Sequence, residues 1–291
     1  MPTSRQPTEL RQDRFKGHGG LVIAADVGGD RNGLPVILLH GGGQTRHSWK
    51  NLAQTLIGND CYVINIDLRG HGDSEWSPEG NYEIGAFVED LRILINAQSS
   101  PPMLVGASLG GITSLLAVGE SEMPIACGIA LIDIVPKVEA EGSDAITRFM
   151  QSNPNGFATL DEAAAAVAAY LPHRPRPASN KGLMKNLRPG KDGRLYWHWD
   201  PKMFEISDHS QRPDQVMDRM EEAARNLRIP TLLVRGGKSD LVSLEGVKHF
   251  LELVPHASFV DVQGAAHMVA GDMNDVFSQA IVDFIKDKLQ H

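Results

Sequence analysis

The sequence has 291 residues, of which 42% are hydrophobic, so it can form one large α/β domain or two small ones. Its net charge of −8 and its lack of a basic block argue against nucleic acid as the main partner and give no support for an anionic membrane surface. Residues 1–15 are polar and no run of 18 apolar residues occurs, which predicts a cytoplasmic protein.

Short apolar and β-branched runs recur along the chain. They predict strands at 21–27, 35–41, 61–70, 102–108, 127–135, 230–237 and 257–264. Helix-like segments lie between most of them, at 47–57, 83–98, 109–119, 243–254 and 273–289. The strand-like runs are nearly continuous rather than alternating, which is typical of strands buried on both faces. The alternation of strands and helices predicts a mostly parallel sheet with helices on both sides.

The interval 136–228 interrupts this alternation because it contains no convincing buried strand. A structureless loop of that length would be unusual in a compact domain. We therefore interpret it as a largely helical insertion, a lid or cap over the edge of the sheet. Its alanine-rich stretch at 160–171 is only weakly apolar on any face, which predicts a thinly packed helix.

A serine stands between the predicted strand 102–108 and the predicted helix 109–119. Gly106 and Gly110 flank Ser108 at i−2 and i+2, and small flanking residues let neighbouring backbones approach. A strand that turns directly into a helix strains the residue at the corner and aims the free N–H groups of the helix at the same place. A plain turn with a capping serine is the alternative, but the context favours a nucleophile.

Further strand ends carry residues that would serve such a nucleophile. The glycines of "HGGG" (40–43) offer backbone N–H groups to a developing negative charge. A serine needs a base, and the base needs an anion to orient it; Asp240 and His267 each follow a predicted strand. Ser108, Asp240 and His267 are therefore expected to converge at one sheet edge. Asp133, at another strand end, is the alternative acid.

These ordered motifs resemble those of α/β-hydrolase fold proteins. The resemblance extends from "HGGG" through "DLRGHGDSEW" (67–76) and Ser108 to the loops of Asp240 and His267. It is closest to the capped group that includes esterases, epoxide hydrolases, cofactor-free perhydrolases and carbon–carbon bond hydrolases. Epoxide hydrolases and haloalkane dehalogenases have an aspartate where this chain has Ser108, which argues against both chemistries.

The resemblance implies an eight-stranded, mostly parallel sheet with a helical cap inserted after the sixth strand. The core would then comprise residues 1–135 and 229–291, and the cap residues 136–228. The resemblance also implies an oxyanion hole built from the backbone N–H groups of Gly42 and Leu109, and it implies that no cofactor is needed. The sequence shows no cluster with good metal-ligand spacing.

Aromatic residues gather in "LYWHWD" (195–200) of the predicted cap. Trp197 and Trp199 would share a face in an extended segment, with His198 opposite. They form either the hydrophobic core of a small cap or a wall over Ser108. In the second interpretation Trp49 and Met268, which lie near the catalytic loops, would line the same pocket.

The expected function is that of a serine carboxylesterase that cleaves small, fairly apolar esters. The same triad would serve cofactor-free perhydrolysis or hydrolysis of carbon–carbon bonds or lactones. A small-molecule receptor with slow turnover is the alternative from a different class. The expected partner is a small ester-like molecule, not nucleic acid or a membrane, and a homodimer is left open.

Overall fold

One eight-stranded sheet forms the centre of the molecule. The computed structural model describes residues 9–171, 179–205, 212–266 and 274–289. The strands follow the order β1-β2-β4-β3-β5-β6-β9-β10. Strand β2 is antiparallel to β1 and β4, and every pairing from β4 to β10 is parallel, which confirms the predicted sheet. The strands of the sheet are β1 (Arg11–Lys16), β2 (Val22–Gly28), β3 (Leu34–Leu39), β4 (Cys61–Ile66), β5 (Met103–Ala107), β6 (Gly128–Ile132), β9 (Thr231–Gly236) and β10 (Ser258–Val262).

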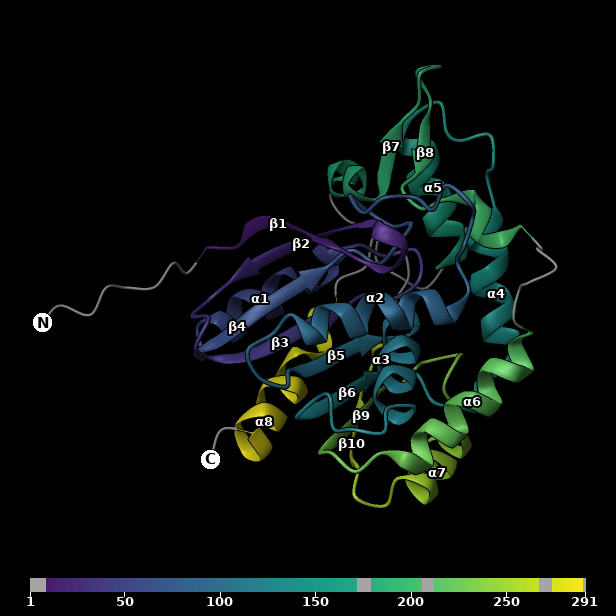
Figure 1. Cartoon of the computed structure of the whole chain (residues 1–291). Coiled ribbons are helices and arrows are strands. Elements are labelled where there is room, and N and C mark those ends of the chain that lie inside the picture. Colours follow the sequence, from purple (N-terminus) through teal and green to yellow (C-terminus); the bar gives the residue numbers. More distant parts are fainter. Residues whose placement is uncertain (1–8, 172–178, 206–211, 267–273, 290–291) are drawn as a thin grey trace, which may run out of the picture.

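Helices cover both faces of the sheet (Figure 1). Ile37 and Leu39 of β3 pack in one apolar cluster with α2, α3, α6 and α7, whereas Val36 and Leu38 pack in a second cluster with α1 and α8. Because successive residues of a strand point to opposite faces, a strand covered on both sides reads as an unbroken apolar run. The helices are α1 (Lys50–Ile57), α2 (Ile84–Asn96), α3 (Leu109–Gly119), α4 (Ala140–Gln151), α5 (Leu160–Tyr170), α6 (Pro213–Asn226), α7 (Leu244–Leu253) and α8 (Ser278–Leu289), with 3-10 turns η1 (His18–Gly20), η2 (Arg46–Trp49), η3 (Asn180–Asn186), η4 (Pro201–Phe204) and η5 (Asn274–Phe277). Among the described helices, none is long and apolar enough to cross a bilayer.

Strand β1 lies outside the strands predicted from the sequence. It occupies one edge of the sheet and pairs only with β2, from Arg11 opposite Val27 to Lys16 opposite Val22. None of its side chains is fully buried. An edge strand with charged residues discourages pairing with other chains, and it needs no apolar run. The sequence "RQDRFK" therefore carried no strand signal.

Residues 136–228, hereafter the inserted segment, connect β6 to β9 outside the sheet. They contain α4, α5, η3, η4 and α6 together with β7 (Leu187–Pro189) and β8 (Leu195–Trp197). Strands β7 and β8 pair antiparallel with each other, a hairpin that the prediction of a helical cap did not include. Figure 1 shows α5, β7 and β8 grouped at one end of the sheet.

The inserted segment has an apolar cluster of its own, and one of its helices packs elsewhere. The fully buried members of that cluster are Phe149, Met150, Phe157, Ala163, Leu187, Trp197 and Trp199. Helix α5 buries only Ala163 completely, which agrees with the predicted thin packing. Helix α6 packs on α3, so closely that a methyl group on Gly119 would lie 2.3 Å from the carbonyl oxygen of Ala223. The division into core and cap at 136 and 228 stays a prediction, and α6 packs with the core.

Candidate active site

Ser108 occupies a strained corner between β5 and α3. Its φ is 45° and its ψ is −112°, although residues with a side chain rarely adopt positive φ. Its N–H donates to the carbonyl oxygen of Ile132 in β6 at 3.1 Å, and its carbonyl oxygen accepts the N–H of Ile112 at 2.9 Å. The side chain is half-buried. Both neighbouring elements therefore hold the corner while a route to solvent remains, as a nucleophile requires.

The flanking glycines are required by close backbone contacts. A methyl group on Gly106 would lie 2.3 Å from the carbonyl oxygen of Gly110, and one on Gly110 would lie 2.5 Å from the carbonyl oxygen of Leu39. Distances this short exclude any side chain, because backbone atoms of a strand and a helix cannot yield. The N–H of Gly110 also donates to the carbonyl oxygen of His40 at 3.2 Å. The start of α3 is thereby tied to the end of β3.

The glycine turn, residues 41–43, lies beside Ser108. A methyl group on Gly41 would lie 3.4 Å from Cβ of Ser108. The N–H groups of Gly41 and Gly43 donate to Gln44 Oε1 at 3.0 Å and to His71 Nε2 at 3.3 Å. Over the described residues, no acceptor pairs with the N–H of Gly42, nor with that of Leu109. Two free N–H groups next to a nucleophile suit a developing oxyanion.

The two candidate acids differ in environment. Asp133 follows β6 with a φ of 52° and is 4% exposed. Its carboxylate accepts the N–H of Gly236 at 3.0 Å and the hydroxyl of Ser239 at 2.7 Å. Asp240 follows β9 and is exposed. A methyl group on Gly142 of α4 would lie 2.4 Å from the backbone carbonyl oxygen of Asp240, so the backbone at Asp240 packs against the inserted segment.

Two predicted site residues, His267 and Met268, lie outside the described residues, and their roles stay predictions. Strand β10 ends at Val262 and the described chain continues to Ala266. In the parallel part of the sheet this end lies on the same side as the ends of β5, β6 and β9.

The three candidate tryptophans occupy two different places. Trp49 is 0% exposed and packs in the cluster of α1 and α8. Trp197 and Trp199 stack on each other with ring centroids 4.9 Å apart and planes 11° from parallel, in the cluster of the inserted segment. Trp199 also reaches the glycine turn, since a methyl group on Gly43 would lie 3.5 Å from its Cζ3. Trp199 therefore lies beside the glycine turn next to Ser108.

Met150 of α4 was missed by sequence reasoning. A methyl group on Gly42 would lie 3.5 Å from Met150 Sδ, so the thioether lies beside Gly42. The carbonyl oxygen of Met150 accepts the indole N–H of Trp199 at 3.2 Å. No feature of the sequence distinguishes Met150 from other methionines, because its contact spans more than one hundred residues of chain.

The sequence model of the Alpha/beta hydrolase family matches residues 36–280. The chain belongs to this family. The matched range includes the glycine turn, Ser108, both candidate acids and His267.

Relatives of this α/β hydrolase include an esterase, Rv0045c of Mycobacterium tuberculosis, which is 28% identical over 266 residues, 87% of this chain and 82% of the relative. The 2-(acetamidomethylene)succinate hydrolase of Mesorhizobium japonicum is 29% identical over 77% of this chain and 78% of the relative. A crystal structure of an α/β hydrolase from Novosphingobium aromaticivorans has the same fold, with a TM-score of 0.80 and 22% identity over 96% of this chain and 98% of that one.

Three buried histidines connect the strand ends of this hydrolase to its inserted segment. The ring centroids of His40 and His71 are 5.1 Å apart, and those of His71 and His198 are 5.7 Å apart. His40 organises the glycine turn: its Nδ1 lies 2.8 Å from the carbonyl oxygen of Gly41, and its Nε2 accepts the N–H of Leu68 at 2.9 Å. Burial lowers the pKa of His40 to about 4 and that of His71 to about 3, and it holds the pKa of His198 well below 6.5.

These rings bridge separate backbone segments. Within the described residues, no group of three His, Cys, Asp or Glu side chains is placed to hold a metal ion. Both nitrogens of each ring already have backbone partners.

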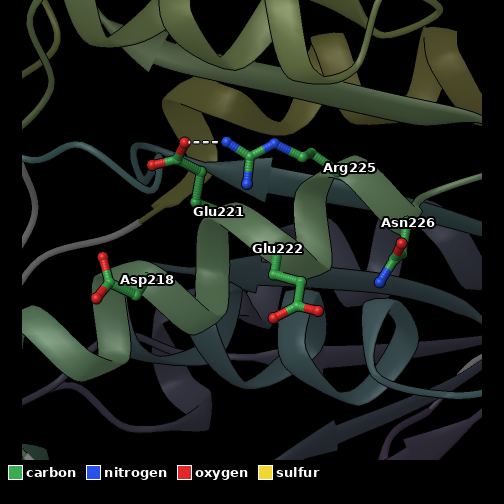
Figure 2. Close-up of a pocket in the computed structure, with 5 residues that line it drawn as sticks. All are labelled: Asp218, Glu221, Glu222, Arg225 and Asn226. Atoms are coloured by element: carbon green, nitrogen blue, oxygen red, sulfur yellow. Dashed lines mark hydrogen bonds and ion pairs between the residues drawn. The ribbon is translucent and has the colours of Figure 1, made fainter.

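An open hollow on α6 is separate from this site. Figure 2 shows its lining side chains and the ion pair between Glu221 and Arg225. Asn226, also in the lining, donates to the carbonyl oxygen of Gly119 at 3.2 Å. Gly119 ends α3 and Ser108 precedes its first residue. An 11-residue helix is about 16 Å long, so the hollow lies at the opposite end of α3 from Ser108.

Proposed function

We propose that this α/β hydrolase is a serine esterase that cleaves small, fairly apolar carboxylic esters. The observation that carries the proposal is the positive φ of Ser108 at a strand–helix corner beside the glycine turn. A strained serine next to two unpaired N–H groups is a costly arrangement for a purely structural turn. It suits a nucleophile whose attack generates a negative charge close by.

In the proposed reaction, Ser108 Oγ attacks the ester carbonyl carbon while neutral His267 takes the hydroxyl proton. The carbonyl electron pair moves to the oxygen, which the N–H groups of Gly42 and Leu109 bind. Collapse of the tetrahedral intermediate expels the alkoxide, which takes the proton from His267 and leaves as the alcohol. Water then attacks the acyl-enzyme with the same base, releases the carboxylic acid and restores Ser108.

We assign the acid of the triad to Asp133, the alternative of the sequence analysis. A triad carboxylate has to be buried and held by other hydrogen bonds so that it orients the imidazole and supports its positive charge. Asp133 is 4% exposed and accepts two hydrogen bonds. Asp240, the first candidate of the sequence analysis, is exposed. Water screens an exposed carboxylate and weakens its effect on a neighbouring ring.

The apolar surroundings of the glycine turn support an apolar acyl group. Met150 and Trp199 lie in van der Waals range of where side chains on Gly42 and Gly43 would be. We place both in the pocket wall and keep Met268 there as a prediction. Trp197 packs behind Trp199, and Trp49 packs in the core, so we place neither in the wall. The esterase named among the relatives supports an ester as the substrate class.

The proposal is tested by ester turnover together with covalent labelling. The protein is incubated with p-nitrophenyl acetate and, separately, with a fluorophosphonate, and the adduct is mapped by peptide mass spectrometry. We expect release of p-nitrophenol and a single adduct on Ser108, neither of which a Ser108→Ala variant gives. An adduct elsewhere on active protein rules out Ser108 as the nucleophile, and absence of both turnover and label rules out the esterase.

Shortening Met150 is expected to change which esters are preferred. Met150→Ala should raise kcat/KM for p-nitrophenyl octanoate relative to the acetate by at least about tenfold, because it removes three heavy atoms and the space of a single methylene is already worth about tenfold. Met123→Ala is the matched control, since Met123 is 71% exposed and belongs to none of the three apolar clusters of the described residues. If Met150→Ala folds normally and keeps the wild-type ratio, Met150 is not part of the pocket wall.

A further inference from the structure

His198 reaches from the inserted segment to the glycine turn. Its Nδ1 accepts the N–H of Gly72 at 2.8 Å, and its Nε2 lies 3.2 Å from the carbonyl oxygen of Gly43. A neutral imidazole has one donor and one acceptor nitrogen. Because Nδ1 accepts a hydrogen bond, Nε2 carries the proton and donates a hydrogen bond to the carbonyl oxygen of Gly43.

The surroundings of this ring keep it neutral. His198 is 1% exposed, and burial holds its pKa well below 6.5. His71, His40 and Arg188 also face it, and a positive charge on any of them would lower the pKa of His198 further. Both hydrogen bonds of the ring are therefore present at neutral pH.

Gly43 is held from two sides. His71 Nε2 accepts its N–H at 3.3 Å, and His198 binds its carbonyl oxygen. Its φ is 73°, which glycine adopts readily. Because glycine has more backbone freedom than other residues, the conformation of the turn at Gly43 depends on the hydrogen bonds that hold it. The Gly43 carbonyl shares a planar peptide unit with the N–H of Gln44, which donates to the carbonyl oxygen of Gly41 at 3.1 Å. The Gly41 carbonyl in turn shares a planar unit with the N–H of Gly42, so holding the Gly43 carbonyl limits how the Gly42 N–H can turn.

We infer that His198 is a positioning residue that keeps the Gly42 N–H in its oxyanion-binding orientation, so that turnover depends on how the inserted segment is seated on the core. The inference rests on the proposed function, since Gly42 is an oxyanion donor only there. It gives the inserted segment a role in binding the oxyanion, in addition to the place of Met150 and Trp199 in the proposed pocket wall.

Other contacts seat the same part of the inserted segment without touching the glycine turn. The indole N–H of Trp76 donates to the carbonyl oxygen of His198 at 3.2 Å. The N–H of Asp200 donates to the carbonyl oxygen of Gly70 at 3.0 Å, and its carboxylate accepts the hydroxyl of Tyr82 at 2.6 Å. These bonds remain when the imidazole is replaced. The effect of the His198 imidazole on catalysis can therefore be measured separately from the docking of the inserted segment on the core.

Two conservative replacements distinguish the two bonds of the ring. The amide nitrogen of glutamine in His198→Gln can take the place of Nε2 and still donate to Gly43. The side-chain oxygen of asparagine in His198→Asn can take the place of Nδ1 and keeps only the bond from Gly72. Removing one oxyanion donor costs about 10² to 10³ in kcat, and a misaligned donor loses part of that. We expect His198→Asn to lower kcat for p-nitrophenyl acetate by roughly 10 to 10² with KM nearly unchanged, and His198→Gln to keep most of kcat.

Trp76→Phe is the control, because it removes a hydrogen bond between the same two parts of the chain and leaves the glycine turn untouched. It should keep the wild-type kcat. A kcat in His198→Asn equal to that of the wild type, or an equal loss in Trp76→Phe, overturns the inference while wild-type turnover still supports the esterase.

An amide readout tests the inference independently of turnover. The N–H of Gln44 shares a peptide unit with the carbonyl oxygen of Gly43, so loss of the imidazole bond should speed hydrogen exchange at Gln44. We expect faster exchange in His198→Asn and wild-type exchange in His198→Gln, followed by NMR. Equal exchange in both variants shows that His198 does not hold the turn, even if the protein hydrolyses no ester.

Discussion

Replacing Asp133 by asparagine is expected to lower kcat/KM for a short ester by about 10⁴, the loss typical of a triad acid. The amide cannot stabilise the imidazolium that forms when His267 takes the serine proton, and it favours the wrong tautomer of the ring. Asp240→Asn should lower kcat/KM by less than about tenfold, because water screens an exposed carboxylate and weakens its effect on His267. Initial rates of p-nitrophenyl acetate hydrolysis measure both.

The comparison needs a check on folding, because Asp133 also holds the loop after β9 through Gly236 and Ser239. Ser239→Ala removes one of these bonds and keeps the carboxylate, so it should lose little activity. Urea unfolding of each variant separates a loss of chemistry from a loss of fold. The reverse ranking of the two asparagine variants would return the acid to Asp240. Two fully active variants would remove the carboxylate from the mechanism.

Mild acid is expected to destabilise the protein strongly. His40, His71 and His198 are neutral in the folded state because burial lowers each pKa, whereas the unfolded chain binds protons at these residues below about pH 6.5. The unfolded state therefore binds more protons, and the free energy of unfolding falls as pH falls below about 6.5. For three such histidines, the free energy of unfolding should fall by about 3 to 4 kcal/mol between pH 6 and pH 5.

Urea unfolding at pH 7, 6 and 5 measures this slope. A loss of that size is a large part of the stability of an ordinary domain. We therefore expect the urea concentration at the midpoint of unfolding to drop sharply between pH 6 and pH 5. His198→Gln removes one of the three groups and keeps its bond to Gly43, so it should reduce the slope by about one third. An unfolding free energy that stays constant from pH 7 to pH 5 would show that these rings are not buried in neutral form.

Most of the fold could be predicted because its signals are local. The doubly covered strands, such as 35–41, contain only apolar side chains over several positions, and the structure places them in the sheet. The hairpin of β7 and β8 and the edge strand β1 could not be predicted this way. Strand β1 pairs with one partner at the edge of the sheet, where a strand needs little apolar surface. Strands β7 and β8 have three residues each, too few for a periodic pattern to be recognised.

The sequence by itself determined the family, the strand–helix corner at Ser108 and the glycine turn. Each of these depends on residues adjacent in the chain, where glycine alone permits the backbone approach. Only the tertiary structure distinguished a buried Asp133 from an exposed Asp240, placed Trp49 in the core and brought Met150 and His198 to the glycine turn. Burial and contacts across one hundred or more residues arise when the whole chain packs, and no local pattern of residue types encodes them.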